Sequence, residues 1–122
     1  LNKEISFTGA HHSMYVCNGE IEKIKGDPYS IGGAQQRDTK IFSSQKISYK
    51  ENQKLYFLTD GYCDQSGGAS NKRFGSAKFK KILLEMQGLK MQDQKEQLET
   101  TFEDWKGSTH QRDDVLVVGI KC

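Results

Sequence analysis

The chain has 122 residues, of which 34% are hydrophobic and 28% charged, and its formal net charge is +2 at pH 7. This length suits one domain, and no stretch of the sequence approaches the ~20 apolar residues that a membrane-spanning helix needs. Such a small net charge does not indicate a nucleic-acid or membrane partner, and without a signal-like start we expect a cytoplasmic protein.

The first residues predict a meander of short strands. Ile5 and Phe7 alternate with polar neighbours, which is typical of a half-buried strand over residues 3–9. An Asn-Gly pair at 18–19 then separates two strand patterns, at 14–17 and 20–25, and this is a strong hairpin signal. His11 and His12 precede the hairpin. Because adjacent strand residues point to opposite faces, we favour turn or packing roles for them over a shared metal ion.

A loop and two further strands are predicted next. Residues 27–38 contain a Gly-Gly pair and show no periodicity, as expected of a loop that is mobile or lines a pocket. Residues 41–49 resume a strand pattern, and the apolar run at 54–59 is typical of a strand covered on both faces. Since only residues 51–53 connect them, we expect these two strands to be antiparallel neighbours.

The apolar run ends at Asp60 and Gly61, where a buried strand reaches the surface. A carboxylate at this point is held on a rigid element, and glycine lets the backbone turn sharply. An ordinary Asp-Gly turn is the simpler interpretation of these residues alone. Residues 65–71 are rich in glycine and serine, and the stretch at 66–72 fits either a flap over a site or a linker.

Two amphipathic helices are predicted in the second half of the chain. Ser76 is a candidate N-cap for the first, which should end near Gly88. The second carries an apolar stripe and should close at Gly107, the stripe consisting of Met91, Leu98, Phe102 and Trp105. Both helices need a partner surface, and we expect the sheet to provide it.

The densest basic stretch of the chain overlaps the first predicted helix. It comprises Lys72, Arg73, Lys78, Lys80 and Lys81. At helical spacing, however, Phe79, Ile82, Leu83 and Met86 form one apolar stripe, which leaves the lysines as a solvated face. We therefore expect no nucleic-acid partner.

The last element, at residues 115–120, is apolar and rich in branched residues, which predicts a central strand. Asp113 and Asp114 precede it, just as Asp60 follows the strand at 54–59. If the two strands are antiparallel neighbours, Asp60 and Asp113 converge. Carboxylates without paired Cys or His ligands favour magnesium, manganese or calcium, although the spacing of a helix-loop-helix calcium site is absent. A purely structural pair of aspartates is the alternative.

The cysteines at 17, 63 and 122 share no metal-ligand spacing, which fits reduced thiols inside a cell. Cys63 lies near Asp60, but no activating base is close in sequence, so a catalytic thiol is the less favoured interpretation.

Five motifs occur in the order of a known family. They are Phe-Thr-Gly-Ala-His at 7–11, Ile-Gly-Gly at 31–33, Leu-Thr-Asp-Gly-Tyr-Cys-Asp-Gln at 58–65, Arg-Phe-Gly at 73–75 and Asp-Asp-Val-Leu-Val-Val-Gly-Ile at 113–120. With them the chain resembles the C-terminal part of a bacterial SpoIIE-like serine/threonine phosphatase of the metal-dependent PPM type (type 2C). The resemblance extends over residues 1–122, which we interpret as one portion of a single phosphatase domain.

The resemblance implies an α+β fold, a mostly antiparallel β-sandwich flanked by helices, here with about six strands and two helices. It also implies a binuclear Mn²⁺ or Mg²⁺ centre at which a metal-activated water hydrolyses phosphoserine or phosphothreonine. Asp60 and Asp113 match metal ligands of the family, and Asp114 stands where the family has Asp or Asn. Substrates of such enzymes are often regulatory phosphoproteins such as anti-sigma-factor antagonists, with a sensor or signalling domain upstream.

The family's first Asp-Gly motif, which bridges both metals, is expected on a strand before Leu1. We therefore expect the 122 residues to be a truncated piece that binds manganese poorly, has little activity, and pairs with another copy through exposed sheet edges. The alternative function is a non-catalytic, phosphatase-like module that transmits a signal or binds a phosphoprotein. The presence of both Asp60 and Asp113 argues against that alternative, because a scaffold has no chemical need for them.

Overall fold

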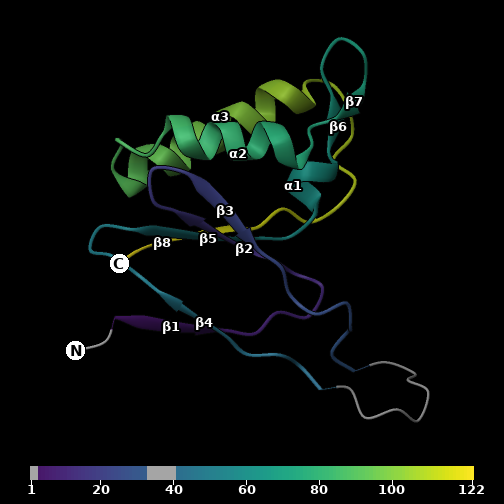
Figure 1. The fold of residues 1–122 in the computed structure, drawn as a ribbon. Coiled ribbons are helices and arrows are strands. Elements are labelled where there is room, and N and C mark those ends of the chain that lie inside the picture. Colours follow the sequence, from purple (N-terminus) through teal and green to yellow (C-terminus); the bar gives the residue numbers. More distant parts are fainter. Residues whose placement is uncertain (1–2, 33–40) are drawn as a thin grey trace.

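The computed structural model describes residues 3–32 and 41–122, and these form an α+β fold with antiparallel strands (Figure 1). The strands are β1 (Glu4–Phe7), β2 (Met14–Cys17), β3 (Ile21–Ile24), β4 (Gln45–Ser48), β5 (Lys54–Leu58), β6 (Ser66–Gly67), β7 (Lys72–Arg73) and β8 (Val117–Lys121). The helices are α1 (Gly61–Asp64), α2 (Ser76–Glu85) and α3 (Met91–Lys106). The predicted fold class is confirmed, and the elements beyond the expected six strands and two helices are the short α1, β6 and β7.

The described chain is built in three layers. A four-stranded antiparallel sheet in the order β3-β2-β5-β8 lies in the middle. Figure 1 shows α2 and α3 on one face of this sheet and the two-stranded β1-β4 ribbon on the other. The hairpin predicted around the Asn-Gly pair is confirmed, since β2 and β3 are antiparallel with Cys17 opposite Ile21.

Strand β2 connects the two cores because all four of its residues are buried. Met14 and Val16 belong to the core shared with the β1-β4 ribbon, whereas Tyr15 and Cys17 belong to the core under the helices. This alternation is the two-residue period of a strand. The sheet is therefore covered on both faces at its centre, as the apolar run of β5 also predicted.

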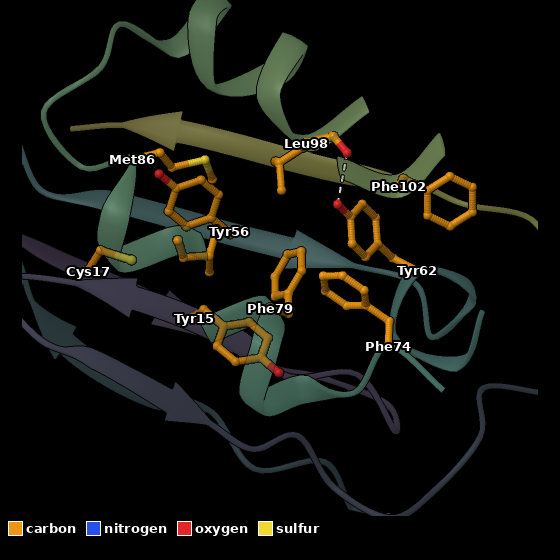
Figure 2. Close-up of a cluster of buried hydrophobic side chains, with 10 residues drawn as sticks. Tyr15, Cys17, Tyr56, Tyr62, Phe74, Phe79, Met86, Leu98 and Phe102 are labelled. Carbon is orange, nitrogen blue, oxygen red and sulfur yellow. Dashed lines mark hydrogen bonds between the residues drawn. The ribbon is translucent and has the colours of Figure 1, made fainter. Parts of the chain in front are cut away.

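The core under the helices is centred on Tyr62, which is 2% exposed (Figure 2). Its ring centroid lies 5.2 Å from that of Phe74 and 5.1 Å from those of Phe79 and Phe102, in the tilted and edge-on arrangements that aromatic pairs prefer. Its hydroxyl donates a hydrogen bond of 2.8 Å to the carbonyl oxygen of Leu98 in α3. The residue that follows the Asp60-Gly61 turn therefore anchors both long helices to the sheet.

The expected pairing of strands 41–49 and 54–59 is wrong. Strand β4 pairs with β1, and both edges of β5 are occupied, by β2 and β8. Asn52 in the short connection has a φ of 66°, and its amide donates to Cys122. The connection therefore passes from one sheet to the other instead of forming a hairpin.

Strand β8 is an edge strand of the described sheet and not the central strand that its composition predicted. It pairs only with β5, and Leu116, Val118 and Ile120 are 57%, 41% and 45% exposed. An apolar run indicates a covered strand, but within residues 3–32 and 41–122 nothing covers this side.

The predicted N-cap of the first helix is also wrong, because Gly75 occupies that position and Ser76 is the first helical residue. Helix α2 ends three residues before Gly88, and α3 closes at Gly107 as predicted.

Residues 66–73 form a β-hairpin whose Gly67 lies against the backbone of Trp105, so this stretch packs on α3. Residues 33–38 of the predicted loop lie outside the described residues. No helix among the described residues is long and apolar enough to cross a membrane.

Candidate metal centre

The end of β5 and the start of β8 lie side by side, as the sequence predicted. The strands are antiparallel, with Leu58 opposite Val117, and the amide of Thr59 donates to the carbonyl oxygen of Leu116 at 3.0 Å. This pairing brings the turn after β5 next to the segment that precedes β8.

Thr59 joins the two segments through its side chain. Its hydroxyl donates to the carbonyl oxygen of Asp114 at 3.0 Å and accepts from the amide of Leu116 at 3.1 Å. Sequence reasoning did not single out this residue. An apolar strand ending in a hydroxyl residue just before the acidic turn was the available signal.

Gly61 lets the same two segments approach closely. A Cβ at this position would overlap the carbonyl oxygen of Asp114 and lie 3.0 Å from its carbonyl carbon. The backbone φ of Gly61 is not positive, so crowding and not conformation requires glycine here. The Asp-Gly turn is therefore a contact between β5 and the Asp113–Asp114 segment as well as a change of chain direction.

The carboxylate of Asp60 is exposed and unused by the local fold. Asp60 is the N-cap residue of α1, yet its side chain makes no capping hydrogen bond. Asp113 is also exposed, and its Oδ1 accepts the amide of Asp114 at 2.8 Å, which holds the carboxylate beside its own strand end. Oxygen donors on two adjoining segments suit a hard divalent cation.

The donor set of the described residues is small. Nowhere in residues 3–32 and 41–122 do three or more His, Cys, Asp or Glu side chains gather closely enough to hold an ion. Asp60, Asp113 and Asp114 therefore lie near the same end of the paired strands β5 and β8, but they do not surround an ion. His11 and His12 are exposed residues of a turn, and His11 has a φ of 61°.

A hollow of about 150 Å³ borders Asp60 on the helix side of the sheet. Its lining includes His11, His12, Tyr15, Lys23, Cys63 and Ser76. Local sequence patterns did not group these residues, because the hollow is formed by β2, β3, α1 and the start of α2, which are distant in the sequence.

The thiol of Cys63 is poorly suited to nucleophilic chemistry. Burial, together with the carboxylates of Asp64 and Asp60, raises its pKa to about 11, and the ammonium group of Lys23 only partly opposes this effect. A thiol with a raised pKa is largely protonated at neutral pH. The three cysteines at 17, 63 and 122 are free, in agreement with the expectation of reduced thiols.

A larger groove of about 640 Å³ lies between α3 and β8. Met91, Leu98 and Phe102 line it from the helix, and Val117 and Gly119 line it from the strand. This groove and the open edge of β8 lie on the same side of the sheet, away from β3.

The sequence profile described as Stage II sporulation protein E (SpoIIE) matches residues 4–122 of this chain. No curated protein sequence matches this chain. Among solved structures, the SiaA-PP2C domain of Pseudomonas aeruginosa superposes with a TM-score of 0.87 at 26% sequence identity. That match covers 98% of this chain and 46% of the SiaA chain, so the 122 residues span about half of this similar structure.

Two structures of SpoIIE from Bacillus subtilis share the fold. The PP2C phosphatase domain with a fragment of the regulatory domain has a TM-score of 0.67 at 18% identity, covering 97% of this chain and 33% of that one. The phosphatase domain has a TM-score of 0.57 at 13% identity, covering 98% of this chain and 57% of the other. In each case the matched region is shorter than the complete phosphatase chain.

Proposed function

This chain belongs to the SpoIIE family, and on that basis we propose that it forms part of a metal-dependent phosphatase acting on phosphoserine or phosphothreonine in proteins. The observation that supports the proposal is the pairing of β5 with β8, in which the Asp60-Gly61 turn lies against the backbone of Asp114. A SpoIIE-like scaffold without chemistry has no need for exposed carboxylates at two adjoining strand ends.

Asp60, Asp113 and Asp114 would hold manganese or magnesium, with Asp114 the weakest candidate because the family has Asp or Asn at its position. When bound, such ions activate a water and neutralise charge on the phosphoryl group. The contribution of this chain is to fix the carboxylates on rigid strand ends, through Thr59 and the close approach at Gly61.

The remaining ligands are proposed to come from outside these residues. A binuclear centre needs more donors than the described residues bring together, and the chain covers 46% of the SiaA structure. We therefore expect residues 1–122 alone to bind Mn²⁺ weakly and to hydrolyse phosphopeptides slowly. Isothermal titration calorimetry on the isolated chain measures the first expectation, and tight binding would contradict it.

The test of the catalytic proposal uses a longer protein that includes the other half of the domain. With Mn²⁺ and a phosphoserine peptide, Asp60→Asn and Asp113→Asn should each lower kcat/KM by at least about 100-fold, because both remove a charged ligand. Asp104→Asn on the exposed face of α3 removes the same charge away from the site and should leave the rate unchanged. Activity that survives both ligand substitutions would refute the assigned roles.

The proposed substrate is a regulatory phosphoprotein, such as an anti-sigma-factor antagonist, in a bacterial signalling pathway with an upstream sensor domain. A cytoplasmic location is part of the proposal, since all three cysteines are free. The second candidate is a phosphoprotein-binding module without catalysis, which the small donor set of the described residues favours. Binding of a phosphopeptide by the longer protein, without Mn²⁺-dependent hydrolysis, would favour this second function.

A further inference from the structure

The hollow beside Asp60 combines side chains that the metal centre does not use. Its volume of about 150 Å³ corresponds to roughly five water molecules at about 30 Å³ each, enough for a phosphoryl group with its oxygens. Tyr15 and Lys23 line it from β2 and β3, and Ser76 lines it from the first turn of α2. Each of these three elements presents a group able to bind an anion.

Tyr15 contributes a hydroxyl that no described residue pairs with. The residue is 3% exposed and its ring packs on Phe79 at 5.7 Å, yet its hydroxyl makes no hydrogen bond with the described residues. Figure 2 shows this hydroxyl directed away from the aromatic cluster. Among the described residues the only fully buried side-chain polar atom without a partner is Oε1 of Gln65, so the Tyr15 hydroxyl is accessible at the hollow and can donate to a group that enters it.

Helix α2 contributes the positive end of its dipole. The helix has ten residues, and its N-cap is Gly75, which has no side chain to cap the first turn. The amides of residues 76–78 therefore keep their hydrogen-bonding capacity, and Ser76 lies at the wall of the hollow. Free amides at a helix N-terminus favour phosphate and other anions.

Lys23 contributes a full positive charge. It lies directly opposite Tyr15 in the β2-β3 register, and its Nζ is 5.7 Å from the centre of the Tyr15 ring. Among the described residues no carboxylate pairs with it. The ammonium group is thus held over the hollow and is available to a phosphate oxygen.

We propose that the hollow formed by Tyr15, Lys23 and the N-terminus of α2 binds the phosphoryl group of a phosphomonoester and holds it beside Asp60. The proposal rests on the proposed phosphatase function and assigns substrate-binding residues to it. Tyr15 donates through its hydroxyl, Lys23 supplies the charge, and the amides of residues 76–78 accommodate the remaining oxygens.

The negative charge of Asp60 should weaken phosphate binding in the hollow. Its carboxylate borders the same hollow and opposes an incoming phosphate, whereas a divalent cation on that carboxylate would remove the repulsion. Without a cation, phosphate binding is therefore expected to be weak, roughly millimolar. It should tighten when the charge of Asp60 is removed by Asp60→Asn, a change that abolishes hydrolysis under the proposed function.

The test is a titration of the ¹⁵N-labelled chain of residues 1–122 with inorganic phosphate, followed by amide chemical shifts in NMR. Saturable shifts are expected at Ser76 and the next two amides. Lys23→Gln should raise the dissociation constant for phosphate roughly tenfold, and Tyr15→Phe should raise it about threefold or more. Asp60→Asn should lower it. Lys25→Gln removes an equal charge outside the hollow and should change nothing.

Shifts that are not saturable, that lie away from α2, or that are unaffected by both Tyr15→Phe and Lys23→Gln would overturn the proposal. Because the readout is binding by the metal-free chain, it is separate from the test of catalysis. The longer protein could fail to hydrolyse phosphopeptides while the chain still binds phosphate with this mutational pattern. That result would support the phosphate site in the hollow and contradict the proposed phosphatase function. In the active longer form, Lys23→Gln should raise KM for the phosphopeptide more than it lowers kcat.

Discussion

Gly61→Ala separates the two strand ends that carry the proposed metal ligands without changing any ligand. The added methyl group would overlap the carbonyl oxygen of Asp114 and would lie 3.3 Å from Cγ2 of Val115. Backbone on one side and a packed branched side chain on the other leave little room for local adjustment. Since carbon contacts are optimal near 3.5–4.0 Å, relief requires a shift on the order of 1 Å between the Asp60 turn and the start of β8.

A shift of this size should have a large effect on catalysis and a moderate one on stability. Misplacing catalytic groups by about 1 Å can cost about 100-fold in rate, so kcat/KM of the longer protein with Mn²⁺ and a phosphoserine peptide should fall by about that factor. Overpacking typically costs about 1–3 kcal/mol in the free energy of unfolding, which urea denaturation measures. The apparent affinity for Mn²⁺ should weaken in parallel with the rate.

Gly88→Ala is the matched control. A Cβ at Gly88 meets no atom within 4 Å and the residue has no positive φ, so this variant should keep both the activity and the stability. If Gly61→Ala folds with unchanged Mn²⁺ affinity and full activity, the spacing between Asp60 and Asp113 does not set the metal site. If the variant loses activity only because it unfolds, the denaturation curve will show it.

Three further outcomes are expected. Thr59→Val removes the hydroxyl bonds to Asp114 and Leu116 and should lower the free energy of unfolding by about 1 kcal/mol in urea denaturation, while Thr59→Ser should retain stability. Cys63 should react with iodoacetamide at pH 8 about 100-fold more slowly than free cysteine, because burial raises its pKa to about 11. Its reaction should become faster as the pH approaches 11, and site-resolved mass spectrometry measures the rate. The isolated chain should dimerise through the open edge of β8, and Val118→Lys should return it to a monomer in light scattering, whereas a wild-type monomer would contradict this pairing.

The meeting of the two acidic strand ends was predictable because it depends on local patterns and on one strand pairing. An apolar run that stops at Asp60, and another that starts after Asp113, indicate two strand ends with carboxylates, and the β5-β8 pairing then places them together. The hollow could not be predicted in the same way. In the sequence Tyr15 has the pattern of a core strand residue and Lys23 that of a solvated lysine. Their proposed function in phosphate binding depends on where α2 begins.

The errors in the predicted fold arise where local patterns do not determine which strands pair. A three-residue connection normally favours a hairpin, but Asn52 adopts a positive φ and the chain crosses from the β1-β4 ribbon to the central sheet. Ser76 is a better N-cap residue than glycine, yet Gly75 is the N-cap and the helix begins at Ser76, one residue earlier than predicted. In both cases a tertiary arrangement overrode a local preference.

Under the proposed function, one pairing would account for both the exposed side chains of β8 and the small number of metal ligands among the described residues. Leu116, Val118 and Ile120 are apolar, as in a covered strand, but they are 57%, 41% and 45% exposed in the described chain. The same strand begins at Val117, four residues after Asp113. A segment from the other half of the domain that paired with β8 would cover these side chains and would also end or begin next to the proposed metal ligands. We therefore expect stability and Mn²⁺ affinity to rise together when that half is present, because both depend on the same pairing.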